Sequence, residues 1–332
     1  MKLSSIRDIL AVVEAGSLRA ASRQLGITQP SITRSIRDTE NELGLSLFTR
    51  HAHGVTLTEM GRLFVQRAKA IQSELRHIVE DLEQAKGRFT GQVSVAMSAA
   101  ASIALMPSIL STFQSQYPLA LLRLTESLFQ PIESQIFSGE IDFFVGPIYE
   151  DHTTSLLVEK LFENRRIVIA RNGHPLAGAK TLAELRDAEW IRPSFSNVRD
   201  EADFETMFER AGLPRPKIAA QSRSAMITLL AVANSNLLTI LPVQWLEFMP
   251  AGERLVAINL GESLKAAPVC IVRRSDLPLT PLAERLCDLI RRAALHYVRK
   301  LASAQDGKGR AGHGDRPGPG LIRHCAGGRK RS

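Results

Sequence analysis

The sequence predicts a protein of the α/β class with a separate helical domain at its N-terminus. Three observations predict this fold. Two short helical segments are joined by a turn at Gly26, an apolar heptad pattern follows between residues 64 and 85, and strands alternate with helices from residue 93 to residue 302. Such an alternation is typical of a largely parallel sheet covered by helices.

The length and composition indicate a globular protein with more than one domain. A chain of 332 residues allows two or three domains, and a hydrophobic content of 44% is ample for packed cores. The first 16 residues have the pattern of an amphipathic helix that contains Arg7 and Asp8, unlike a secretory signal. No segment has the apolar length of a membrane span. We therefore expect a cytoplasmic protein that does not associate with a membrane.

The region from Ser17 to Gly44 predicts a helix-turn-helix. Ser17 is placed to cap a first helix, and Gly26 provides the left-handed backbone that ends it. Thr28 is a candidate N-cap for a second helix. Pro30 lies in the first turn of that helix, where a missing N–H costs nothing.

The second helix has an apolar face and a polar face. Ile32, Ile36 and Leu43 form the stripe that we expect to face inward. The pattern fits an ordinary surface helix, and it also fits a helix whose polar face reads the major groove of DNA. The DNA-contact residues that it predicts are Thr28, Gln29, Pro30, Ser31, Thr33, Arg34 and Arg37.

Residues 45–61 favour the DNA-binding alternative because they predict a wing. Leu47 and Phe48 can pack beneath the helices, while Arg50 precedes a loop that ends at Gly54. A positive side chain on such a loop would meet phosphate beside the second helix. Arg50 therefore joins the predicted DNA contacts, and residues 1–58 form the predicted DNA-binding domain.

A long helix is predicted from Thr58 to Lys86. Its apolar residues are spaced alternately by four and three positions, which is a heptad seam. At about 1.5 Å per residue the helix would be roughly 40 Å long, so we expect a partner helix rather than packing against its own domain alone. Residues 59–92 are the predicted linker helix and hinge. The seam residues are Phe64, Ala68, Ile71, Leu75, Ile78, Leu82 and Ala85.

Four motifs, GSLRAAS, LGITQPSITRSIRDTENELG, LFTR and LTEMG, follow one another in the order and spacing of a known family. In them the sequence resembles the LysR-type transcriptional regulators, and the resemblance extends more loosely to about residue 302. Thr39 is a departure, because the family usually has leucine there. The resemblance implies a bacterial regulator that binds a double-stranded DNA operator, a homodimer formed through the linker helix, a homotetramer, and contact with RNA polymerase.

Residues 93–302 predict an α/β domain with two subdomains. Subdomain I comprises about residues 93–163 and 268–302, and subdomain II about residues 164–267. The resemblance implies a hinged effector-binding domain of the periplasmic-binding-protein type. Strands are expected at 92–97, 120–127, 141–146, 165–171, 189–193, 217–222, 237–242, 254–260 and 267–274. Helices are expected at 98–118, 132–137, 181–187, 201–211, 224–233 and 280–301.

Two strand-to-helix junctions predict an effector site, because helix N-termini present free N–H groups to anions. The alternative is that the serines there only cap helices. The junctions contribute Ser98, Ala99, Ala100, Ser222 and Ser224. The resemblance adds Phe129, Pro147, Phe195 and Ser196 to the same pocket. Serines, helix ends and aromatic rings suggest a small organic acid, for which an aromatic carboxylate or sulfonate is one candidate.

The remaining features point away from catalysis. Cys270, Cys287 and Cys325 form no paired metal motif, and no catalytic or phosphate-binding motif occurs, so we expect neither an enzyme nor a cofactor.

Residues 303–332 predict a disordered basic tail. They carry seven Lys and Arg against two Asp, and so supply +5 of the formal net charge of +8. The competing function is a cytoplasmic solute-binding or architectural DNA-binding protein without effector control.

Overall fold

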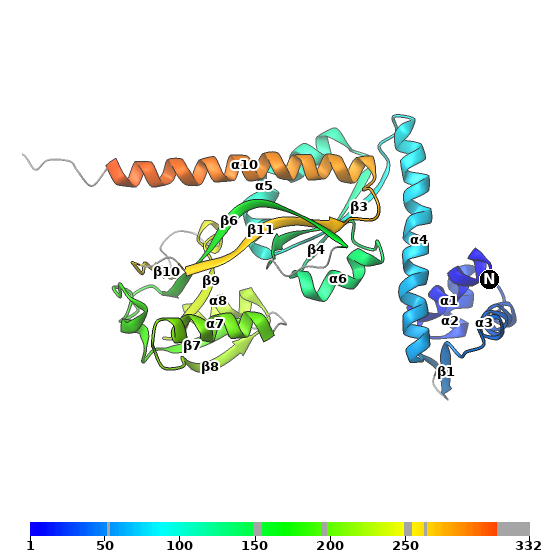
Figure 1. The fold of residues 1–332 in the computed structure, drawn as a ribbon, viewed down its shortest axis with the longest axis horizontal. Helices are drawn as coiled ribbons and strands as arrows, with labels where there is room; N and C mark the ends of the chain where they lie inside the picture. Colours follow the sequence, from blue (N-terminus) through cyan, green and yellow to red (C-terminus); the bar gives the residue numbers. More distant parts are fainter. Residues whose placement is uncertain (52–53, 149–154, 194–197, 249–253, 262–263, 311–332) are drawn as a thin grey trace, which may run out of the picture.

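The computed structural model describes residues 1–310, except residues 52–53, 149–154, 194–197, 249–253 and 262–263. A small N-terminal domain lies at one end of a long helix, α4 (Glu59–Ala85), and an α/β domain lies beside the other end (Figure 1). Among the described residues, no helix is both long and apolar enough to cross a membrane.

The N-terminal domain has the predicted winged helix-turn-helix. Ser17 caps the second helix by accepting the Ala20 N–H, and Gly26 ends it with a φ of 66°. The helix that follows is capped by Thr28, which accepts the Ser31 N–H. The elements are α1 (Leu3–Ala15), α2 (Leu18–Leu25), α3 (Gln29–Leu43), β1 (Phe48–His51) and β2 (Gly54–Leu57).

The core of this domain confirms most of the predicted inward stripe of α3. Ile32 and Ile36 are buried, but Leu43 is 41% exposed, so its predicted burial is wrong. Leu43 is the last residue of α3, where the packed part of the stripe has ended. Thr39 is buried instead, and its hydroxyl donates to the Ser35 carbonyl, which satisfies the polar group that replaces leucine.

The apolar seam of α4 is packed against the N-terminal domain at its start and is exposed farther along the helix. Phe64 and Ala68 pack into the core of the N-terminal domain. The large seam residues farther along the helix are uncovered in the described chain, where Ile71, Leu75, Ile78 and Leu82 are 39% to 60% exposed. The first turns of α4 therefore belong to the DNA-binding domain, and the rest of the seam is available to a partner.

The α/β domain is built on a seven-stranded sheet in the order β10-β6-β11-β5-β3-β4, with β9 also paired to β6. Strand β3 is parallel to β4 and β5, and β11 is antiparallel to β5 and β6. Two further strands, β7 and β8, form a separate parallel pair. The strands are β3 (Gly91–Met97), β4 (Ala120–Glu126), β5 (Phe143–Pro147), β6 (Leu156–Arg171), β7 (Glu189–Pro193), β8 (Lys217–Ser222), β9 (Thr239–Pro242), β10 (Leu255–Ile258) and β11 (Leu264–Arg274).

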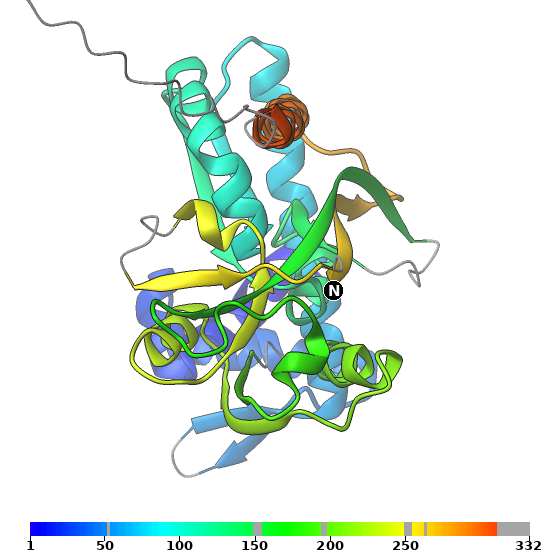
Figure 2. The ribbon, with the colours of Figure 1, turned by 90° about the vertical axis from the view of Figure 1, so that its left-hand side faces the viewer.

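Helices cover both faces of the sheet in subdomain I. Helices α5 and α10 share one large apolar cluster with β3 and β11, and they lie side by side in Figure 2. Helix α6 packs on the other face with Phe144 and Val272. The helices are α5 (Ala99–Gln116), α6 (Phe129–Phe137), the 3-10 helix η1 (Leu182–Leu185), α7 (Val198–Arg210), α8 (Ala225–Ala233), α9 (Trp245–Phe248) and α10 (Pro281–Arg310).

The link between the subdomains differs from the expectation. The expected strand 165–171 is only the second half of β6, which pairs with β11 from Leu156↔Arg274 to Arg166↔Leu264. The predicted boundaries at about residues 163 and 268 therefore fall inside two paired strands. The two stretches of chain that pass between the subdomains are therefore hydrogen-bonded to each other as strands, which satisfies most of their backbone groups. A register shift between Ala266 and Val269 interrupts this pairing near the predicted boundary.

Helix α10 also extends beyond its expected end. It continues to Arg310, so the first eight residues of the predicted disordered tail are helical. Adding a residue to an existing helix costs far less than starting one, which favours this extension. Residues 311–332 lie outside the described part of the chain.

Candidate DNA-binding face and effector site

The exposed face of α3 carries the predicted DNA-contact side chains. Its hydroxyl groups are engaged locally: Thr28 Oγ1 lies 2.8 Å from Ser31 Oγ, and Thr33 Oγ1 donates to the Gln29 carbonyl at 3.0 Å. Within the described residues, no hydrogen bond or ion pair holds the side chains of Arg34 and Arg37. Both guanidinium groups are therefore free to meet an external acceptor.

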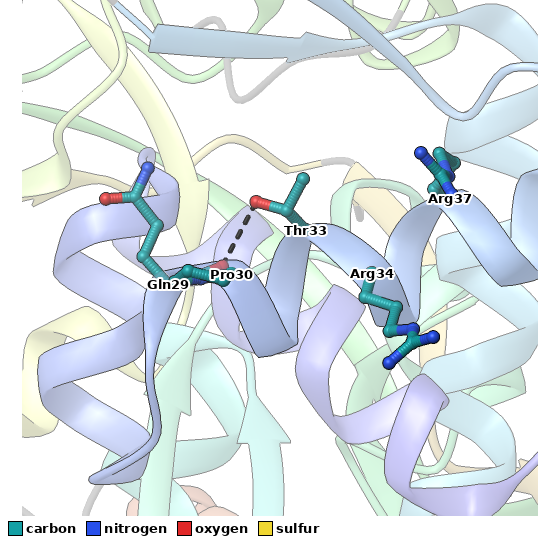
Figure 3. A pocket seen from close by; sticks show the side chains of 5 residues that line it. All are labelled: Gln29, Pro30, Thr33, Arg34 and Arg37. Atoms are coloured by element: carbon teal, nitrogen blue, oxygen red, sulfur yellow. Dashed lines mark hydrogen bonds between the residues drawn. The ribbon is translucent and has the colours of Figure 1, made fainter.

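These side chains surround a shallow hollow on the surface of α3. Its volume is about 670 Å³, and it is lined by Gln29, Pro30, Thr33, Arg34 and Arg37. Figure 3 shows Gln29, Thr33 and Arg37 projecting to one side of the helix, while Arg34 points to another. A helix with donors on two sides of its exposed face can contact base edges and flanking phosphates together.

The wing is a two-stranded antiparallel hairpin. Arg50 lies on β1 opposite Val55 on β2, one residue before the end of β1, and the loop residues 52–53 are outside the described chain. His51 Nε2 lies 2.9 Å from Thr56 Oγ1, which links the two strands through their side chains. The backbone thus places Arg50 at the tip of the hairpin, as the sequence predicts.

The first effector junction is at the start of α5. Ser98 Oγ accepts the Ala101 N–H at 3.2 Å, and the Ser98 N–H donates to the Val145 carbonyl at 2.9 Å. Gly146 packs closely against Ser98, because a Cβ on this glycine would lie 3.0 Å from the Ser98 Cβ. Pro147, which follows at the end of β5, is therefore near the same junction.

The second junction is at the start of α8. Ser224 Oγ accepts the Ile227 N–H at 3.3 Å and so caps the helix. Ser222 Oγ donates to the Ser224 carbonyl at 3.0 Å and lies 3.2 Å from the Ser224 nitrogen. Ser98 and Ser224 therefore act as helix caps in this structure, while Ser222 holds the turn before α8.

The starts of α5 and α8 pack against one apolar cluster. Ala99 and Ala225, the first residues of α5 and α8, pack in one apolar cluster with Leu229 and Trp245. Ala100, the next residue of α5, is buried. The first residues of two helices from different subdomains therefore pack against the same apolar cluster.

Of the two aromatic residues taken from the resemblance, only Phe129 is in the described part of the chain. Phe129 packs beneath α6 against Phe144, with ring centroids 5.7 Å apart, and it belongs to a different apolar cluster. Its place in the pocket stays a prediction. Phe195 and Ser196 lie outside the described residues.

Thr239 on β9 is a candidate that the sequence analysis did not identify. Side chains alternate along a strand, so Thr239 shares a face with Leu241, which belongs to the cluster that contains Ala99 and Ala225. Thr239 is fully buried, and its hydroxyl has no hydrogen-bond partner among the described residues. The sequence offered only a threonine in an apolar strand, which is a weak signal.

The two described cysteines are buried and unpaired. Burial raises the pKa of the Cys270 thiol to about 11, and burial likewise raises the pKa of the Cys287 thiol. Both thiols are therefore protonated at neutral pH, and a protonated thiol is a poor nucleophile. Their surroundings fit packing side chains of the core.

Two family models match the chain. The model described as a bacterial regulatory helix-turn-helix protein of the lysR family matches residues 3–62, and the model described as a LysR substrate binding domain matches residues 86–295. The chain belongs to the LysR family of transcriptional regulators. It is accordingly a DNA-binding regulator with an effector-binding domain.

Relatives of known name agree with this assignment. The chain is 26% identical over 280 residues to the HTH-type transcriptional regulator TdcA of Escherichia coli K12, covering 84% of this chain and 88% of the relative. It is 26% identical over 307 residues to the HTH-type transcriptional regulator GbpR of Azospirillum brasilense, covering 90% and 89%.

Solved structures share the fold. Full-length CbnR in complex with its target DNA superposes with a TM-score of 0.65 at 23% identity, covering 88% of this chain and 100% of that one. A single-substitution variant of full-length OxyR from Pseudomonas aeruginosa superposes with a TM-score of 0.66 at 18% identity, covering 89% and 94%. These identities support the architecture alone.

Replacing Arg34 with alanine should weaken operator binding by about 1 to 3 kcal/mol if the guanidinium contacts a base. The side chain is exposed on α3 and has no internal partner among the described residues, so folding should be unaffected. Gel-shift titrations at fixed salt measure the change. Arg186→Ala, on the surface of subdomain II, is the matched control, and an Arg34→Ala chain with wild-type affinity would contradict the assignment.

Proposed function

We propose that this regulator controls transcription in response to a small organic acid that binds between the N-termini of α5 and α8. The observation that supports this site is the packing of Ala99 and Ala225 in one apolar cluster. Each helix N-terminus carries the positive end of its dipole, so a ligand that reaches both helix starts is favoured if it carries a negative group. The negative group of the effector is a carboxylate or a sulfonate.

The surroundings of the junction favour an effector with an aromatic body. Ile103, Leu229 and Trp245 line the cluster around the two helix starts, and apolar walls with a few polar groups are typical of sites for small aromatic ligands. The unpartnered Thr239 hydroxyl supplies a hydrogen-bonding group at the same place. The site therefore combines anion recognition with an apolar wall.

The proposal includes a homodimer formed through α4. Ile78 and its neighbours in the seam are exposed in one chain, and two such seams would cover each other in a coiled coil. Further exposed apolar side chains support a homotetramer, because pairing through α4 alone leaves them uncovered. They are Leu121 and Leu124 on β4, and Met226, Ile227 and Leu230 on α8.

The proposed regulator acts in the cytoplasm, where an operator is accessible, and it communicates with RNA polymerase at the promoter. It is not proposed to be an enzyme, since its named relatives are transcriptional regulators. A purely architectural DNA-binding protein is the competing function. The two are distinguished by whether a small ligand changes operator binding.

An aspartate in place of Ile78 should separate the dimer, because it would place a charge in the covered seam. Ile78 is 55% exposed in the single chain, so the substitution should leave the fold of each subunit intact. Analytical ultracentrifugation at low micromolar concentration measures the mass. Gln66→Asp, at an exposed position that shares the face of Ser73 rather than that of the seam, should leave the mass unchanged. An unchanged mass for Ile78→Asp would remove the coiled-coil proposal.

Replacing Thr239 with valine should weaken effector binding about tenfold while preserving the fold. Valine has nearly the same shape, and removing a buried hydroxyl that lacks a partner costs little stability. Benzoate, salicylate, benzenesulfonate and succinate can be screened by thermal shift, and the strongest ligand titrated by calorimetry. Thr112→Val, on α5, is the control. Equal affinities in wild type and Thr239→Val would exclude this hydroxyl from the site.

A further inference from the structure

Helix α4 has a second stripe that is polar and faces its own α/β domain. Ser73, His77, Glu80 and Gln84 are spaced by four, three and four residues, so they share one face of the helix. Ser73, Glu80 and Gln84 are buried and His77 is half-buried, although the apolar seam of the same helix is exposed. The polar side of α4 is thus the side that packs within the chain.

The C-terminal part of this stripe is held by backbone groups of the α/β domain and of the linker that leads into it. Gln84 Oε1 accepts the Leu282 N–H of α10 at 2.8 Å, and Gln84 Nε2 donates to the Thr90 carbonyl at 3.3 Å. Glu80 Oε1 accepts the Gln92 N–H of β3 at 3.2 Å. These contacts dock the end of α4 onto β3 and α10.

The middle of the stripe contains an ion pair with a buried carboxylate. His77 Nε2 lies 3.1 Å from Asp142 Oδ1, and the Asp142 side chain is only 4% exposed. The other carboxylate oxygen, Oδ2, accepts the Ser94 N–H of β3 at 2.7 Å. Asp142 therefore connects α4 to the central sheet.

Other charged groups also face His77. On α4, Glu74 Oε1 lies 3.9 Å from Nδ1, and Arg76 Nη2 lies 3.1 Å from Nε2 while donating to the Gly139 carbonyl at 3.2 Å. From β11, Arg274 contacts Glu74 at 3.3 Å. Arg274 also pairs with Asp276 at 3.0 Å. Asp142 is the nearer of the two carboxylates beside the ring, and Glu74 is shared with Arg274, so Asp142 is the main acceptor for the ring.

These surroundings raise the pKa values of two side chains on α4, His77 and Glu80. The hydrogen bond to Asp142 raises the pKa of His77 above its ordinary 6.5, with burial and Arg76 opposing and the charges of Asp142 and Glu74 adding. Burial raises the pKa of Glu80 above its ordinary 4.5, although the Gln92 N–H, Arg76 and His77 oppose it. Both groups therefore hold a proton more tightly when α4 is docked.

We propose that His77 and Asp142 form a proton-dependent latch that docks α4 onto the α/β domain, with Glu80 adding to the same response. The stabilisation from His77 is fully present below pH 6.5 and is lost as the pH rises through the raised pKa. Docking buries the Glu80 carboxyl, so its ionised form opposes docking as the pH rises above 4.5. Acid tightens the latch through both groups.

The latch has a consequence for regulation that rests on the proposed function. Helix α4 carries the DNA-binding domain at one end and the exposed seam along its middle, so docking fixes both relative to the effector site. Proton uptake would then bias the arrangement of the two wings on DNA. The contact itself can be tested without DNA or effector, so its failure is distinguishable from failure of the proposed function.

Hydrogen exchange of the Gln92 and Ser94 amides tests the latch in the full-length protein, because Glu80 and Asp142 accept these two N–H groups. Wild type and His77→Gln are compared by mass spectrometry from about pH 5.5 to about pH 8.5. The ratio of their rates at each pH cancels the intrinsic pH dependence. We expect exchange in His77→Gln to be about three- to tenfold faster at the acid end and equal at the alkaline end.

Two further variants complete the experiment. His296→Gln, an exposed histidine on α10, should match wild type at every pH. Glu80→Gln keeps the acceptor oxygen and removes the ionisable group, so its Gln92 amide should exchange more slowly than in wild type above neutral pH, even if His77→Gln does not fold. A His77→Gln ratio that is the same at every pH, or a Glu80→Gln chain that exchanges like wild type above neutral pH, would overturn the proposal.

Discussion

The rest of the structure depends on one constraint: α4 must pack against two domains at once. At its N-terminal end, Gly61 lies against the β1 strand region so closely that a Cβ would come within 2.1 Å of the Leu47 carbonyl oxygen. At its C-terminal end, Gln84 accepts the Leu282 N–H of α10. A helix held at both ends transmits a displacement of one domain to the other, since a continuous hydrogen-bonded helix is stiff over this length.

The two faces of α4 make different kinds of contact. Its polar stripe is used within the chain, which leaves the apolar stripe around Ile78 for a second subunit. The usual amphipathic rule assigns the apolar face to the interior of a monomer, and here that rule holds only for the first turns, at Phe64 and Ala68. Polar contacts made with directional groups such as His77 and Asp142 can be broken and remade at lower cost than a dry apolar contact, which suits a joint that has to move.

Local signals predicted the N-terminal domain almost completely. The cap residues Ser17, Thr28 and Thr58 and the left-handed Gly26 act within one helical turn, so their roles can be inferred from neighbouring residues alone. The α/β domain was predicted in element order for the same reason. The continuous pairing of β6 with β11 was missed because it joins residues about a hundred positions apart. The polar stripe was missed because the role of His77 is recognisable only once Asp142 is placed beside it. Thr239 was missed because its burial depends on residues that are distant in the sequence, such as its strand partner Ile169.

The central claim is that effector and operator binding are coupled across α4. Thermodynamic linkage gives the most direct test, because the factor by which a ligand changes operator affinity must equal the factor by which operator DNA changes ligand affinity. The strongest ligand from the organic-acid panel is titrated calorimetrically into the protein with and without saturating operator, and the operator is titrated with and without saturating ligand. We expect the ligand to change operator affinity, and operator DNA to change ligand affinity by the same factor. Affinities that are independent of the other partner in both directions would contradict it.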